Sequence, residues 1–151
     1  MLIIEKSLKE LRDNLASMTE VVLDMLELVK NSLEQEKINE LEVVFKQDKH
    51  LDQLEKSLDR QCMELLALIN PHASDLRFVF SVIKVNVDLE RMGDECKNVA
   101  REMKGYSDKV PPEMKELAQM VFDTAKQTFK DRKSTRLNSS HIQKSRMPSS
   151  A

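Results

Sequence analysis

Hydrophobic side chains in the first 35 residues recur at alternating steps of three and four, which is the spacing of one face of an α-helix. The same spacing returns between Ile38 and Ile69, where Asn70-Pro71 interrupts it, because proline is accepted at the start of a helix and not in its interior. The pattern predicts two long amphipathic helices. Their apolar stripes are Leu8, Leu11, Leu15, Met18, Val22, Met25 and Val29 in the first, and Leu41, Val44, Leu51, Leu58, Cys62, Leu65 and Ile69 in the second.

A third helix, predicted over Ser74–Lys104, carries apolar residues on two opposite sides. The two stripes lie roughly 165° apart at 100° per residue, so two different neighbours must cover this helix. Gly93 lies inside it at a cost of about 1 kcal/mol relative to alanine, which indicates a close backbone approach or a nearby ligand. One stripe is Phe78, Val82, Val85, Leu89, Met92, Cys96, Val99 and Met103, and the other is Leu76, Phe80, Ile83 and Val87.

The segment Gly105–Pro112 is typical of a helix end followed by a linker. Residues 112–130 then start a new helical pattern that can be laid over the first helix, as if a three-helix unit were beginning again. Short connections favour antiparallel neighbours. We therefore predict an all-α fold, with an up-down-up three-helix bundle over residues 1–106 and, over 107–130, a linker and the first helix of an incomplete second bundle.

The composition of the 151 residues supports this fold class, since 33% are charged, 4% are aromatic and only two are glycine. No run of about 18 apolar residues is present, and the start of the chain lacks the pattern of a secretory signal. Two cysteines are too few for a disulfide framework and fit a reducing compartment. The sequence predicts a cytoplasmic helical protein with no direct membrane insertion.

The last 21 residues differ in composition, with six serines, five basic residues and one acidic residue. A disordered basic tail and an arm for nucleic acid would both fit these numbers. A third interpretation explains more, because DRKSTRLNSSH (131–141) resembles the translation of a common sequencing-library adapter and SRMPSSA (145–151) resembles its continuation in the same frame. We interpret 131–151 as a non-native, disordered tail, and expect the natural gene product to continue differently beyond Lys130.

Acidic residues continue the second apolar stripe of the third helix. The steps of that stripe lead to Glu90 and then Asp94, which places two carboxylates one above the other on one face. On the second helix, Asp48, Asp52 and Glu55 follow the edge of the apolar stripe with similar spacing. Like charges one turn apart repel by a few tenths of a kcal/mol, so a bound cation would relieve the local field. Carboxylate oxygens suit Mg²⁺, Ca²⁺, Mn²⁺ or iron.

The alternative is that these acids are ordinary solvated helix faces, paired with Lys84, Arg91 and Lys97. Catalysis is disfavoured, because no nucleophile or phosphate-binding glycine loop accompanies the carboxylates. A ferritin-like oxidase would need Glu-x-x-His on paired helices, and no glutamate here has a histidine three positions later. No basic patch indicates nucleic-acid binding. The sequence thus predicts a protein that is not an enzyme.

Two segments carry a resemblance to a known family. NPHASDLRFVFSVIKVNVDLERMGDECKNVA (70–100) resembles the PhoU pattern of proline, A-x-D-L-R, a helix, and D-L-E-R-[IM]-G-D followed by asparagine. FKQDKHLDQLE (45–55) is similar to the D-x-x-[IL]-D-x-L-E of helix two in the same family. The resemblance to the PhoU family, the phosphate-uptake accessory regulators of bacteria and archaea, covers about residues 5–130.

The resemblance implies two tandem three-helix bundles, each with an E(D)-x-x-x-D motif that binds a multinuclear metal cluster. Glu90 and Asp94 match this motif in the first bundle. Asp48 and Asp52 match the acids of helix two and rank lower as ligands, and Asn98 ranks lower again. The metal would be Fe, Zn, Mn, Mg or Ni, and the second cluster motif would belong to a second repeat that this chain does not complete.

The resemblance also implies a function. The protein would repress the phosphate-starvation response by contacting the phosphate ABC transporter ATPase and a sensor histidine kinase, as a homodimer peripheral to the inner membrane. Two alternatives stay open at this point. One is the PhoU-like cytosolic domain of a sodium–phosphate cotransporter, and the other is a helical interaction module whose carboxylates bind no metal.

Overall fold

The computed structural model describes residues 2–35, 38–105 and 110–145, with side chains placed up to Asp131. Within these ranges the chain forms helices and no strands. The long helices are α1 (Ile3–Gln35), α2 (Leu41–Glu64), α3 (Ala73–Gly105) and α4 (Pro112–Ser145). A short 3₁₀ turn, Ile38–Glu40, leads into α2, and a π-helical turn, Leu65–Ile69, follows it. The predicted all-α class is confirmed.

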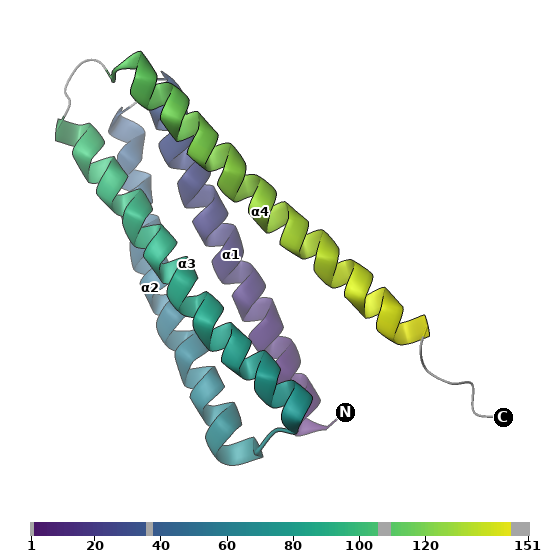
Figure 1. Ribbon diagram of the computed structural model, residues 1–151. Helices are drawn as coiled ribbons and strands as arrows, with labels where there is room; N and C mark the ends of the chain where they lie inside the picture. The colour runs from purple at the N-terminus through teal and green to yellow at the C-terminus, as the bar shows by residue number, and fades with distance from the viewer. Residues whose placement is uncertain (1, 36–37, 106–109, 146–151) are drawn as a thin grey trace. The chain divides into compact units, whose positions relative to one another are not determined.

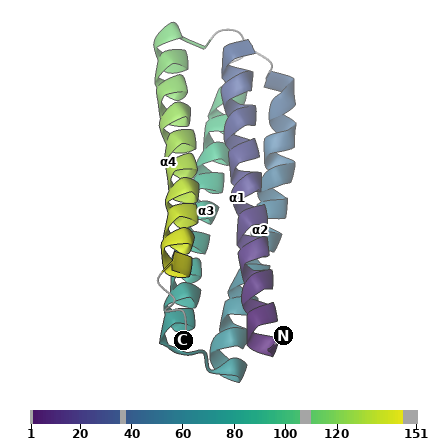
Figure 2. The same cartoon turned by 90° about the vertical axis from the view of Figure 1, so that its right-hand side faces the viewer.

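Helices α1, α2 and α3 run up, down and up beside one another and form the first of two compact units, Met1–Val110 (Figures 1 and 2). The predicted stripe of α1 is buried along its whole length, from Leu8 to Val29. On α2 the predicted positions from Leu41 to Leu65 are also buried. The heptad spacing therefore predicted most of the core, and the short connections predicted the topology.

The connection between α2 and α3 begins at a residue in the left-handed conformation. Asn70 has φ 48°, and asparagine is one of the few residues other than glycine that adopts this conformation readily. The left-handed residue ends the π-helical turn, and Pro71 follows it in a buried position. Asn70-Pro71 thus separates the two helices where the sequence predicted.

The core-facing side of α3 differs from the predicted stripe. Phe78, Val85 and Met92 are only partly buried, and Val99 is 40% exposed. At every second turn, the residue that faces α1 and α2 is the one that follows the predicted position. The residues on this face include one polar residue and one glycine. The buried set is Val79, Val82, Asn86, Leu89, Gly93, Cys96, Ala100 and Met103.

Close approach between helices explains this shift. A Cβ atom on Gly93 would overlap Cδ2 of Leu51 on α2 and lie 3.8 Å from the sulfur of Met25 on α1. Asn86 donates a hydrogen bond from Nδ2 to the backbone oxygen of Glu55, at 3.1 Å, and so links α3 to α2. Glycine occupies position 93 because Leu51 leaves no room there for a Cβ atom.

The second apolar stripe of α3 lies outside this core, as its position on the helix predicted. Phe80 is 50% exposed and Val87 is 49% exposed, whereas Leu76 and Ile83 are partly buried. The stripe leads toward Glu90 and Asp94, so an apolar surface adjoins the acidic positions along one side of α3.

The second unit, Pro111–Ala151, contains α4. The structure describes this helix as far as Ser145, and the interpretation of 131–151 as a non-native, disordered tail stays a prediction. Residues 146–151 lie outside the described ranges, and the origin of the tail stays a prediction. None of the described helices has an apolar stretch long enough to cross a bilayer.

Gly93 provides a direct test of the close approach between α2 and α3. We expect Gly93→Ala to lower the free energy of unfolding by about 1–3 kcal/mol, because overpacking at Leu51 outweighs the better helix propensity of alanine. Chemical denaturation followed by circular dichroism measures this. Gly105→Ala is the control, since an added Cβ there meets nothing within 4 Å. Equal stability of the two variants would contradict the close approach.

Candidate metal centre

Two acidic residues occupy positions of α2 that the heptad pattern assigns to the core. Asp48 and Glu55 fall between Val44, Leu51 and Leu58 in the sequence of buried positions. Asp48 is only 5% exposed, so it lies within the packed face of the helix and not at its edge as predicted. A carboxylate in such a position is costly unless a counter-ion or hydrogen bonds compensate its charge.

Lys97 on α3 supplies a counter-ion for Asp48. Its ammonium nitrogen lies 3.0 Å from Oδ2 of Asp48 and 3.2 Å from Oδ1 of Asp94, so one cation is shared by two carboxylates on two helices. The two hydrogen bonds raise the pKa of Lys97, which stays charged at neutral pH. We call this arrangement of Asp48, Lys97 and Asp94 the lysine bridge.

Glu90 and Asp94 form a second carboxyl contact along α3. The two side chains share a hydrogen bond, which raises the pKa of Glu90 and lowers that of Asp94. Lys97 lowers the pKa of Asp94 further. The predicted stacking of Glu90 over Asp94 on one face is therefore confirmed. Two carboxyl groups in contact repel each other when both are ionised, so a cation beside them would be stabilised.

Asp52 and Glu55 of α2 face the same place. The hydrogen bond to Asp94 and partial burial contribute most to the raised pKa of Glu90. The charges of Asp94, Glu55 and Asp52 raise this pKa further by smaller amounts. The structure therefore brings Asp48, Asp52, Glu90 and Asp94, the four predicted ligands, to one side of the α2–α3 pair. Asn98 is exposed on α3. We call Asp48, Asp52, Glu55, Glu90 and Asp94 the acidic cluster.

The acidic cluster offers the right donors for a hard cation but is not a closed cage. Oδ1 of Asp48 is buried and has no hydrogen-bond partner, so a carboxylate oxygen is available next to Lys97. Carboxylate oxygens are the ligands that Mg²⁺, Mn²⁺ and iron accept. Within the described part of the chain, however, no three acidic, histidine or cysteine side chains converge closely enough to hold a metal as they stand. Binding requires side chains of the cluster to move.

The cysteines do not extend this donor set. Burial raises the pKa of the Cys62 thiol to about 11, with a smaller contribution from Asp59. Burial, Glu95 and Asp48 raise the pKa of Cys96 to about 12. Metal ligation needs the thiolate, so at neutral pH both residues act as small hydrophobic core residues.

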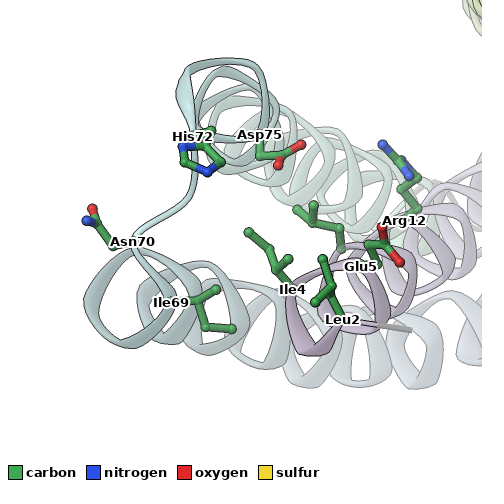
Figure 3. Close-up of a pocket in the computed structure, with 9 residues that line it drawn as sticks. Leu2, Ile4, Glu5, Arg12, Ile69, Asn70, His72 and Asp75 are labelled. Atoms are coloured by element: carbon green, nitrogen blue, oxygen red, sulfur yellow. The ribbon is translucent and has the colours of Figure 1, made fainter.

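A hollow of about 520 Å³ lies near the N-terminal end of α3 (Figure 3). Leu2, Ile4 and Ile69 give it an apolar wall, and His72 and Asp75 at the start of α3 lie across from them. The hollow carries charges of both signs and shares no residue with the acidic cluster. Its lining shows no consistent preference for one ligand chemistry.

Comparison with known proteins places the chain in a family. The model of the PhoU domain matches residues 15–103, which include α2, most of α1 and α3, and the acidic cluster. The chain belongs to the PhoU family. The predicted family and three-helix fold are thus confirmed.

The relatives are phosphate-transport accessory proteins. The chain is 35% identical over 95 residues to the "phosphate-specific transport system accessory protein PhoU homolog" of Aquifex aeolicus, covering 63% of the chain and 43% of that relative. It is 30% identical over 124 residues to PhoU homolog 1 of Thermotoga maritima, covering 81% of the chain and 53% of that relative. The chain thus spans about half the length of these relatives.

A solved structure supports the fold. The crystal structure of PhoU from Pseudomonas aeruginosa matches with a TM-score of 0.74 at 28% identity, over 79% of this chain and 57% of that protein. The similarity extends beyond the matched domain of residues 15–103.

The raised pKa of Glu90 predicts a pH-dependent effect of Glu90→Gln in metal-free buffer. When Glu90 is ionised, the charges of Asp94, Glu55 and Asp52 repel it. The stability that protonated Glu90 contributes is therefore present below its ordinary pKa and is lost as the pH rises through the raised pKa. At pH 7 we expect the variant to gain a few tenths of a kcal/mol to about 1 kcal/mol relative to wild type.

Urea denaturation at pH 4 and pH 7 measures this difference, and the gain should be confined to the higher pH. Glu20→Gln, at an exposed position on α1, is the control. A variant that is less stable than wild type at pH 7 would show that Glu90 is not under electrostatic strain.

Proposed function

We propose that the chain is part of a non-enzymatic phosphate-signalling regulator whose acidic cluster binds metal. Glu90 and Asp94 are the principal ligands and Asp48 and Asp52 contribute from α2. The bound species is a divalent or iron centre, with Fe, Zn, Mn, Mg or Ni as the candidate metals. The observation that carries the proposal is the Glu90–Asp94 carboxyl pair, on which the charges of Asp52 and Glu55 act, together with Asp48, which Lys97 links to Asp94 and which has one buried oxygen without a partner.

The regulatory part of the proposal follows from the relatives. They are named as accessory proteins of a phosphate-specific transport system. We propose that the complete protein contacts the phosphate ABC transporter ATPase and a sensor histidine kinase on the cytoplasmic side of the inner membrane, as a homodimer, and so represses the phosphate-starvation response. The names of the relatives favour this role over that of a cotransporter domain.

In the metal-binding role, the residues of the chain have separate tasks. Glu90 and Asp94 would both offer carboxylate oxygens to the cation, which would offset the repulsion between them that raises the pKa of Glu90. Asp48 and Asp52 add negative charge from the neighbouring helix, which holds α2 and α3 together when a cation is bound. The metal supplies charge neutralisation between the two helices.

We expect Mn²⁺ to raise the melting temperature of the wild-type chain, because a ligand that binds only the folded state stabilises it by about 2.7 kcal/mol at 100 times its Kd. The double variant Glu90→Ala, Asp94→Ala should keep its helicity and lose this response. Differential scanning calorimetry with and without Mn²⁺ measures both. Mg²⁺ and Fe²⁺ in place of Mn²⁺ identify the preferred ion.

The matched control is the double variant Glu20→Ala, Asp24→Ala, an exposed acidic pair with the same spacing on α1. It should respond to Mn²⁺ as wild type does. A wild-type chain whose melting is unchanged by all three ions, or an equal response in both double variants, would contradict the proposed metal site. In the first case the chain would be a helical interaction module without metal.

The same variants test the regulatory role in a bacterium that lacks its own PhoU gene. A reporter of phosphate starvation should be repressed by the complete protein and released by the Glu90→Ala, Asp94→Ala variant. Repression that is equal with both would separate regulation from metal binding.

A further inference from the structure

The lysine bridge occupies the place where a metal would have to bind. The ammonium of Lys97 reaches Asp48 on α2 and Asp94 on α3 at 3.0 Å and 3.2 Å, and Asp94 is also the partner of Glu90. A divalent cation bound by Asp94 and an α2 carboxylate would compete with Lys97 for the same oxygens. It would also be repelled by the ammonium at such short range.

The burial of Asp48 explains why the chain needs this lysine in the absence of metal. The side chain of Asp48 is 7% exposed, so its charge is largely removed from water. A buried carboxylate without a counter-ion is strongly destabilising, whereas the paired form is tolerated. Lys97 is partly exposed, at 26%, and its four-carbon chain can withdraw into solvent without unfolding the helix.

We infer that Lys97 is a tethered cation that holds the acidic cluster in the metal-free state and must leave it when metal binds. This inference rests on the proposed metal function and specifies how the same site is regulated. The lysine sets the affinity for the metal, because each binding event includes the loss of its two ion pairs. When metal binds, the link between α2 and α3 through Lys97 is replaced by a link through the metal. The two helices are therefore joined in both states.

Lys104 provides a matched control on the same helix. It also joins α3 to α2, through an ion pair with Glu42, and its ammonium lies 4.8 Å from the ring centre of Phe45. It is two turns away from Lys97 along α3, and the lysine bridge does not include it. Neutralising either lysine changes the net charge equally, so a difference between the two variants reports on position and not on overall charge.

The test is a titration of the full chain with Mn²⁺ alone, followed by electron paramagnetic resonance of the free ion. Lys97→Met should bind Mn²⁺ tighter than wild type by on the order of tenfold, because the competing ammonium is gone. Lys104→Met should bind as wild type does. Lys97→Arg keeps the charge and should not reproduce the gain.

The outcomes separate this inference from the proposed function. If wild type binds Mn²⁺ and Lys97→Met binds no tighter, the lysine inference is wrong and the metal site stands. If neither chain binds, the metal site is wrong and the inference fails with it. If Lys97→Met binds Mn²⁺ and wild type does not, the lysine prevents binding, which supports the inference. The same result would contradict metal binding by the wild-type chain over the concentrations used.

A second measurement needs no variant and so does not depend on the fold of Lys97→Met. Acetylation of wild-type chain by an amine-reactive ester, followed by peptide mass spectrometry, reports how accessible each lysine is. Saturating Mn²⁺ should increase the labelling rate of Lys97 several-fold and leave that of Lys104 unchanged. Equal labelling of Lys97 with and without bound Mn²⁺ would show that the lysine does not leave, and would overturn the inference.

Discussion

A buried carboxylate on α2 imposes the main constraint on the first bundle. Asp48 takes a position that the heptad pattern reserves for an apolar side chain, and its charge is compensated by Lys97 from α3 at 3.0 Å. An ion pair of this kind contributes little net stability, but losing one partner is costly. The register of α2 against α3 is therefore fixed by charge as well as by apolar packing.

Close packing places the two helices where this pairing is possible. Gly93 lets α3 approach Leu51 of α2. Asn86 of α3 donates a hydrogen bond to the backbone of Glu55, which lies one turn after Leu51 on α2. These contacts lie on the same pair of helices as the acidic cluster. The lysine bridge and core packing thus act on one interface, and the proposed metal would bind at that same interface.

Periodicity alone predicted the helices and the stack of Glu90 over Asp94, because both follow from the 3.6-residue repeat within one helix. The antiparallel order followed from the short connections between the helices. Three features needed the contacts between helices. Asp48 is buried although charged residues usually mark solvent faces. The core of α3 includes Gly93, which a search for apolar residues passes over. Lys97 was predicted as a partner of nearby acids, but its bond to Asp48, 49 positions earlier, depends on how α2 and α3 align.

The most direct test of this account is a crystal structure of the chain grown with Mn²⁺, with the ion located by anomalous scattering. The account predicts an anomalous peak bound by oxygens of Glu90 and Asp94, at least one oxygen of Asp48 or Asp52 nearby, and the Lys97 ammonium withdrawn from both aspartates. An intact bridge from Lys97 to Asp48 and Asp94, with no peak beside Glu90, would contradict it.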